Sequence, residues 1–62
     1  MCESNAYIIE DGKEQMLLES VDVLRPEGDG WYLRSAFGEQ KTVDAHVKEI
    51  RLMDHKIILE KN

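Results

Sequence analysis

A single cysteine, Cys2, is the residue of this sequence best suited to chemistry, because it stands at the very start of the chain. Its neighbours Glu3, Ser4 and Asn5 are polar, whereas a buried structural cysteine normally lies within an apolar run. A terminal thiol is accessible, and its thiolate form is a strong, soft metal ligand. Cys2 is therefore the candidate metal ligand; the competing interpretation is an incidental thiol at a chain end.

Further donors for such a site would come from the chain end itself or from a second chain. If Met1 were removed, the new α-amine and the Cys2 sulfur would close a five-membered chelate, and the amide nitrogen of Glu3 could add a third donor. Two such termini meeting at a dimer axis would supply four nitrogen and sulfur donors, a set that suits square-planar Ni(II). Thiolate softness also admits Zn(II) and copper, so the choice among the three metals stays open.

The other chemically active side chains give weaker signals. His46 and His55 lie nine residues apart, and neither has a short metal-ligand spacing to the other or to Cys2. Both are interpreted as surface histidines, with a ligand role for His55 only if the fold brings its turn near the N-terminus. The Glu27–Gly30 stretch lacks the alternating acids and the terminal Glu of an EF-hand, which excludes calcium.

Catalysis finds no support in the sequence. The one thiol has no nearby histidine along the chain, no phosphate-cradling glycine motif is present, and 62 residues are too few to enclose a pocket. We therefore expect a protein that is not an enzyme.

Nucleic-acid binding is the alternative from a different class. Trp31, Tyr32 and Phe37 could form a base-stacking platform, although a core plus one interface aromatic explains them at least as well. The net charge of −5 opposes RNA binding, and the acids are concentrated in residues 1–31, which hold eight acidic and two basic residues. The second half could still present a small basic patch, formed by Arg34, Lys41, Lys48 and Arg51.

The elements that must position these residues are short strands. Apolar and β-branched residues predict strands at residues 4–10, 13–18, 30–37, 41–47 and 56–60, with strand character resuming at Val21. The Asp11-Gly12 pair predicts a tight hairpin, and Glu19-Ser20 predicts a bulge or sharp bend. Residues 25–30 are expected to form a loop, whereas Gly38-Glu39 and Asp54-His55 are expected to form turns.

A change of phase interrupts the second half of this pattern. Val43, Ala45 and Val47 alternate on one face, but Ile50 and Leu52 have the opposite parity. A bulge or a short helical turn near residues 48–49 would explain the change. The strand count and the close spacing of turns predict an all-β fold, a small and strongly bent antiparallel barrel of the SH3 or Sm type with five to seven strands.

Length and composition set the remaining expectations. Residues 1–62 leave room for one domain, and a chain this short buries only about 60% of its unfolded surface. One cysteine excludes an internal disulfide, so we expect a homodimer to supply the missing apolar burial. No signal peptide opens the chain, and the longest apolar run, residues 6–9, cannot span a membrane, so a cytoplasmic location is expected.

The sequence as a whole resembles the CooT family of small nickel-binding proteins. The resemblance is carried by the opening Met1-Cys2, the strand that ends at Asp11-Gly12, the Val21–Leu24 strand before the glycine-rich loop, and the closing segment Glu49–Glu60. It implies a homodimer of small β-barrels that binds one Ni(II) through paired Cys2 residues and assists nickel delivery to carbon monoxide dehydrogenase. Its partners would be that nickel enzyme or its maturation factors. Family members have also been labelled RNA-binding proteins, which keeps a Sm-like RNA-binding module as the alternative.

Overall fold

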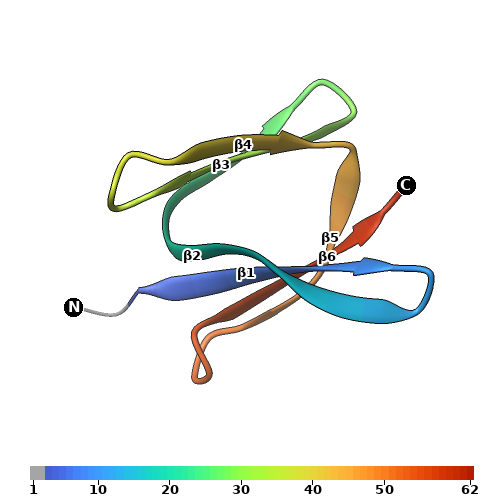
Figure 1. Ribbon diagram of the computed structural model, residues 1–62, viewed down its shortest axis with the longest axis horizontal. Helices are drawn as coiled ribbons and strands as arrows, with labels where there is room; N and C mark the ends of the chain where they lie inside the picture. Colours follow the sequence, from blue (N-terminus) through green and yellow to red (C-terminus); the bar gives the residue numbers. More distant parts are fainter. Residues whose placement is uncertain (1–2) are drawn as a thin grey trace.

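The computed structural model describes residues 3–62, and Cys2, the candidate metal ligand, lies outside that range. The described residues form six strands and no helix, so no helical segment among them could cross a membrane (Figure 1). The strands are β1 (Ser4–Glu10), β2 (Lys13–Glu27), β3 (Gly30–Ser35), β4 (Gln40–Val43), β5 (Ala45–Arg51) and β6 (Lys56–Lys61). The prediction of an all-β chain is confirmed.

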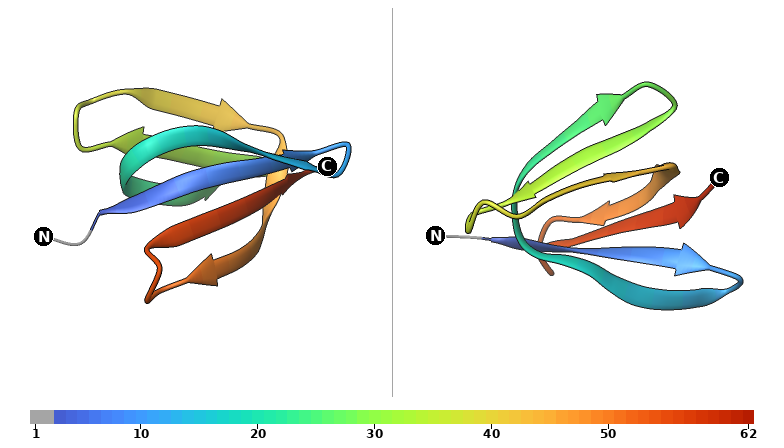
Figure 2. Two further views of the ribbon diagram at one scale, coloured as in Figure 1. Left: turned by 60° about the horizontal axis from the view of Figure 1, so that its bottom comes forward. Right: turned by 45° about the horizontal axis from the view of Figure 1, so that its top comes forward.

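All six strands belong to one sheet, in the order β4-β3-β2-β1-β6-β5. The sheet curls into a half-barrel, as the two views of Figure 2 show. Every neighbouring pair is antiparallel except β1 and β6, which run parallel and pair from Asn5 with Lys56 to Ile9 with Glu60. The small, strongly bent barrel expected from the sequence is confirmed, but the expected antiparallel pairing throughout is wrong for β1 and β6, which makes the sheet mixed.

The concave side of the sheet holds the hydrophobic core. Its buried members come from five strands and are Ala6, Leu18, Leu33, Ala45, Ile57 and Leu59. Trp31 packs against this core, whereas Tyr32, the next residue on β3, faces away from it, where its ring receives the Arg25 guanidinium. The predicted alternation of Trp31 and Leu33 on one face with Tyr32 on the other is confirmed.

Local turn chemistry sets the first hairpin and the long second strand. Asp11 and Gly12 have φ angles of 54° and 77°, the left-handed conformation that a two-residue turn between twisted strands requires. Ser20 also has a positive φ, 54°, and β2 bends there while continuing as a strand to Glu27. The sharp bend expected at Glu19-Ser20 is confirmed.

The structure corrects two details of the expected strands. Residues 25–27 belong to β2 and pair with β3, so the expected loop shrinks to a turn at Gly28-Asp29. The expected strand over residues 41–47 divides at Asp44, because the chain turns a corner there and passes from one edge of the sheet to the other. Gly30 lies against this corner, where a Cβ atom would overlap the Val43 carbonyl oxygen.

The phase change in β5 arises from a bulge. The register with β6 shifts between Val47 and Glu49, which leaves Lys48 without a directly opposite partner. Of the two explanations open at the sequence level, a bulge or a helical turn, the structure selects the bulge. The bulge places Ile50 on the same face as Ile57, where Ile50 remains 48% exposed.

Candidate functional site

The residues that follow Cys2 are held at one end of the half-barrel. Asn5 enters β1 between two other strands and is bonded on both sides: its side chain contacts β2, and its backbone contacts the segment before β6. Three peptide bonds connect Cys2 to Asn5, with Glu3 and Ser4 between them, so covalent geometry limits the distance between their Cα atoms to about 11 Å. Any chemistry of Cys2 therefore takes place within reach of this end, which we call the N-terminal end.

Ser20, at the bend of β2, is the residue that ties this end together. Its backbone N–H donates to Asn5 Oδ1 at 3.0 Å, and its hydroxyl donates to Glu3 Oε2 at 2.8 Å. Its carbonyl accepts from Ala36 N–H at 2.8 Å. Through these three hydrogen bonds, Ser20 joins Glu3 and Asn5 at the start of the described residues to Ala36 in the β3–β4 turn.

The turn between β5 and β6 closes on the other side of Asn5. It runs from Leu52 to His55, and His55 N–H donates to the Leu52 carbonyl at 3.4 Å. The His55 carbonyl in turn accepts from Asn5 N–H at 2.9 Å. The predicted Asp54-His55 turn is confirmed, and the condition set for His55 at the sequence level is met, because the fold does bring its turn beside the N-terminal segment.

Buried Ser35 organises the β3–β4 turn. Its hydroxyl oxygen accepts from Phe37 N–H at 3.1 Å and from Glu39 N–H at 3.0 Å, while its own N–H donates to the Glu39 carbonyl at 2.8 Å. Ser35 is only 3% exposed, so these bonds are shielded from water. The turn so formed projects Phe37 outward with 83% of its surface exposed.

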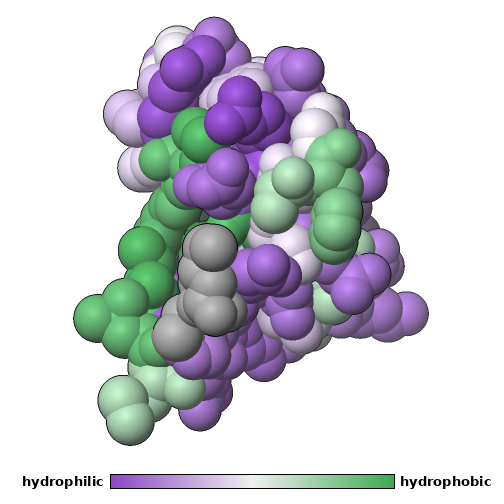
Figure 3. Space-filling view, turned by 90° about the vertical axis from the view of Figure 1, so that its left-hand side faces the viewer, coloured by the Kyte–Doolittle hydropathy of each residue, from purple (hydrophilic) through white to green (hydrophobic). Residues whose placement is uncertain are grey.

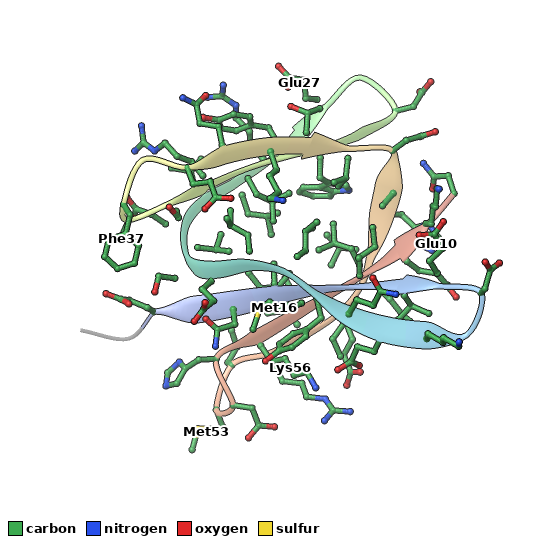
Figure 4. All side chains as sticks on the ribbon, in the orientation of Figure 1. Glu10, Met16, Glu27, Phe37, Met53 and Lys56 are labelled. Carbon is green, nitrogen blue, oxygen red and sulfur yellow. The ribbon has the colours of Figure 1, made fainter. Side chains whose placement is uncertain are left out.

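Three large apolar side chains are exposed at the N-terminal end. They are Phe37 on the β3–β4 turn and Leu52 and Met53 on the β5–β6 turn, with exposures of 83%, 79% and 92%. Figure 4 shows the labelled Phe37 and Met53 at this end, on either side of the start of β1. We call these three residues the apolar rim.

Exposed apolar side chains are grouped on the face at this end. Figure 3 shows one column of hydrophobic side chains and a second, separate hydrophobic group across the same face. A hollow of about 280 Å³ also opens here, lined by Met16–Glu19 of β2 and by Ser35, Phe37 and Glu39. Clustered exposed apolar groups mark interaction surfaces more often than isolated ones do.

Two ion pairs involve the residues that flank the β5–β6 turn, Arg51 and Lys56. Lys56 Nζ lies 2.9 Å from Glu14 Oε2 and 4.7 Å from the centre of the Tyr7 ring. Glu49 accepts a hydrogen bond from Arg51 at 3.2 Å, and this contact raises the pKa of the Arg51 guanidinium. The cations of these two pairs are therefore already engaged by carboxylates of the same chain.

His46 contacts residues at the C-terminal end of the chain, away from the N-terminal end. His46 Nδ1 lies 2.9 Å from Asn62 Oδ1, and its Nε2 lies 3.4 Å from Glu60 Oε1. Asn62 also donates from Nδ2 to Asp44 Oδ1 at 2.8 Å, which fastens the end of the chain to the corner between β4 and β5. The exposure of His46 and His55 agrees with their interpretation as surface residues.

The residues considered for nucleic-acid stacking are not brought together. Trp31 packs on the core, Tyr32 lies on the opposite face with its hydroxyl 3.0 Å from Gln40 Oε1, and Phe37 belongs to the N-terminal end. Arg34 of the expected basic patch is within 3.7 Å of Asp22 Oδ2. A shared platform of the three aromatic side chains is therefore not formed.

The chemistry available to one chain is limited. Within residues 3–62, no three His, Cys, Asp or Glu side chains gather as a metal-binding group. The described residues thus form a small β-fold whose N-terminal end exposes three large apolar side chains.

Comparisons with known proteins identify the family. A family model described as "CO dehydrogenase accessory protein CooT" matches residues 1–60. This family consists of accessory proteins and not of enzymes. The chain belongs to the CooT family.

A solved structure supports the same assignment. A crystal structure assigned to CooT from Carboxydothermus hydrogenoformans shares 41% sequence identity with this chain, covers 98% of both chains and superposes with a TM-score of 0.90. No curated protein matches the chain. The family resemblance expected from the sequence is confirmed.

Sequence reasoning missed several residues that build this end. Ser20 and Ser35 are small polar residues whose roles depend on contacts with distant parts of the chain. The apolar rim had a weak signal, because Leu52 and Met53 directly precede the predicted Asp54-His55 turn. Apolar residues beside a turn are poor candidates for the core, and that pattern could have indicated an exposed surface.

Proposed function

We propose that this CooT-family protein binds Ni(II) as a cytoplasmic homodimer and assists nickel delivery to carbon monoxide dehydrogenase. The Cys2 thiolates of two chains would be ligands of one shared metal ion. The observation that carries the proposal is the anchoring of the N-terminal segment at an end bordered by exposed apolar residues. It joins the one thiol of the sequence to a surface suited to pairing.

The small number of donors among the described residues supports a dimer in this proposal. A four-coordinate site needs more ligands than one cysteine, and residues 3–62 hold no group of three such side chains. A two-fold axis through the N-terminal end would double every donor, since such an interface presents the same patch from both copies. It would also bury the apolar rim twice.

The fit of the metal rests on the chemistry of the donors. Thiolate and nitrogen donors suit Ni(II) in square-planar geometry, whereas a hard cation such as Mg²⁺ prefers oxygen ligands. Ni(II) is the cargo in this proposal, and no ion is retained for catalysis. A site at an exposed end with few ligands exchanges metal with an acceptor more readily than a closed tetrahedral site does.

The handover to an acceptor would depend on protonation. Metal binds the thiolate and not the thiol, so binding releases a proton and protons compete for the ligand. An acceptor site with more donors would draw the metal from the dimer, leaving Cys2 free for another cycle. In this account the protein supplies a transient binding site and a docking end, and performs no bond-breaking chemistry.

A metal titration tests the proposal. Purified protein and its Cys2→Ser variant are titrated with Ni(II) while ultraviolet-visible absorption is recorded. We expect thiolate-to-nickel charge-transfer bands that saturate at one metal per two chains and are absent from the variant. A wild-type titration without such bands would overturn the proposal and make RNA or protein binding the next function to test.

A further inference from the structure

The hollow of about 280 Å³ at the N-terminal end is a feature that the proposed metal site does not use. Part of its lining comes from β2, through Met16–Glu19, and the rest comes from the end of β3 and the turn after it, through Ser35, Phe37 and Glu39. Binding sites for small molecules and cofactors usually measure about 300–1,000 Å³. This hollow lies just below that range, so its size suits a side chain of a partner protein better than a cofactor.

Hydrogen bonds hold the two sides of the hollow in place. Ala36 N–H donates to the Ser20 carbonyl at 2.8 Å, which joins the β3–β4 turn to the bend of β2. Ser35 Oγ accepts from Phe37 N–H at 3.1 Å and from Glu39 N–H at 3.0 Å, so one lining residue fixes the backbone of two others. A site that is formed before its partner arrives loses less conformational freedom on binding.

The Ser35 hydroxyl keeps one hydrogen-bonding group that the protein does not use. A serine hydroxyl has two lone pairs and one O–H donor, and both lone pairs of Ser35 accept N–H groups of the turn. The hydroxyl donors that find an acceptor within residues 3–62 are those of Ser20 and Tyr32. Ser35 is only 3% exposed, and a buried donor without an acceptor is unfavourable. An oxygen acceptor brought into the hollow would satisfy it.

Two carboxylates give the hollow its charge. Glu19 and Glu39 are exposed lining residues, and the lining contains no Lys, Arg or His. The five ion pairs within residues 3–62 all use other carboxylates. The hollow therefore combines apolar side chains, two acceptors of negative charge and one hydroxyl donor. Its complement is a cation on an aliphatic stem that also carries an oxygen acceptor.

We propose that this hollow is a docking site for an arginine residue of a partner protein. The inference goes beyond the proposed function, because it concerns protein recognition and requires no metal. The aliphatic stem of the arginine would contact Met16 and Leu17, while its guanidinium would face the carboxylates of Glu19 and Glu39. Arginine suits the hollow better than lysine, because a planar guanidinium bonds carboxylates through several N–H groups and stacks on an aromatic ring such as that of Phe37.

The main chain of the partner residue supplies the remaining group. Its carbonyl oxygen is an acceptor for the Ser35 O–H, which a free guanidinium could not provide. The hollow shares only Phe37 with the apolar rim, since Leu52 and Met53 of the β5–β6 turn do not line it. Docking from the side of β2 therefore leaves the β5–β6 turn open to a second copy of the chain.

An NMR titration with two matched probes tests the docking site. The ¹⁵N-labelled full chain is titrated with N-acetyl-argininamide and, separately, with N-acetyl-citrullinamide, which keeps the shape and the carbonyl groups but has no charge. We expect saturable amide shifts confined to residues 16–20 and 35–39 with the arginine probe. The citrulline probe should bind roughly tenfold or more weakly, because hydrogen bonds between charged groups are stronger than neutral ones.

Carboxylate substitutions supply a matched pair of variants. Glu19→Gln/Glu39→Gln should bind the arginine probe roughly tenfold or more weakly than the wild type does. Glu27→Gln/Asp29→Asn removes the same two charges from exposed positions at the β2–β3 turn, which does not line the hollow, and should leave the affinity within about twofold. All four positions are exposed, so folding should be retained, and circular dichroism verifies it.

Each outcome decides the proposal. Shifts confined to the hollow, weakened by Glu19→Gln/Glu39→Gln and kept in the control variant, would establish it. Equal binding of the two probes, equal loss in the two double variants, or no shifts at the hollow would overturn it. Amide shifts at the hollow that change on dilution of the protein alone would show that a second copy covers it, which would also overturn the proposal. None of these results depends on nickel, so they are independent of the outcome of the metal titration.

Discussion

The apolar rim makes a quantitative prediction about pairing. If two copies meet at the N-terminal end, replacing Leu52 by Glu should weaken the dimer severely. Leu52 is 79% exposed in the single chain, and fully burying a leucine side chain contributes about 1.5–3 kcal/mol. Burying the exposed part therefore contributes about 1–2.5 kcal/mol for each copy.

The symmetry of the interface doubles this effect. Both copies of a two-fold dimer carry the substitution, so the loss is about 2–5 kcal/mol of association free energy. Every 1.4 kcal/mol is about a tenfold change, which makes the dissociation constant at least about 30-fold larger. Folding of the single chain should change little, because substitutions at exposed positions usually stay within about 0.5 kcal/mol.

Sedimentation velocity at a series of concentrations measures the effect directly. Gln15→Glu is the charge-matched control, because Gln15 is exposed near the Asp11-Gly12 hairpin and gains the same single negative charge. Wild type and the control should dimerise alike, and Leu52→Glu should sediment as a monomer at concentrations where they are dimers. An unchanged dimer in folded Leu52→Glu would refute the placement of the interface at this end.

Three further predictions concern the scaffold and the metal. Gly30→Ala should lower the free energy of unfolding in urea by about 1–3 kcal/mol, because the alanine Cβ would overlap the Val43 carbonyl. An unchanged urea midpoint would show that the chain at the corner between β4 and β5 can relax. Ser35→Ala should lower the free energy of unfolding by about 1–3 kcal/mol in the same assay, because the N–H groups of Phe37 and Glu39 lose their acceptor. Ser35→Thr keeps the hydroxyl and should lower it less. Equal losses in the two variants would assign the effect to packing. Protons compete with the metal for each thiolate, so nickel affinity should fall up to about tenfold per pH unit and per thiolate ligand below the thiol pKa, which is about 8.5 when unperturbed. A nickel affinity that stays constant between about pH 6 and 9 would contradict thiolate ligation.

Local signals in the sequence predicted much of the fold. The Asp11-Gly12 turn depends on two adjacent residues that accept positive φ, so it could be read without knowing the rest of the structure. The alternation around Leu33 likewise follows from a period of two. The bend at Ser20 was visible as an interruption between two apolar runs.

Long-range features could not be predicted in the same way. Nothing near Asn5 indicates that its parallel partner is Lys56, because strand pairing depends on the curl of the whole sheet. The division of the fourth expected strand at Asp44 has the same origin, since alternation continues through the corner. The neighbourhood of His55 and the N-terminal segment follows from that pairing and was therefore only a condition at the sequence level.

The candidate site combined both kinds of information. Cys2 was chosen from the sequence by its type and position, and it lies outside residues 3–62, so its role stays a prediction. The structure adds the contacts of the segment that follows it: those of Ser20 with Glu3 and Asn5, and the hydrogen bond from Asn5 N–H to the His55 carbonyl. These are contacts between residues far apart in the chain, which no local pattern encodes.

A mixing experiment tests the shared metal site most directly. Wild-type protein and a mass-tagged Cys2→Ser variant are combined, exchanged and loaded with Ni(II), and native mass spectrometry counts the metal on each assembly. The account predicts one nickel on the wild-type dimer, a strong loss on the mixed dimer that carries a single Cys2, and none on the variant dimer. Nickel on wild-type monomers, or equal loading of all three dimers, would contradict a site built from two Cys2 thiolates.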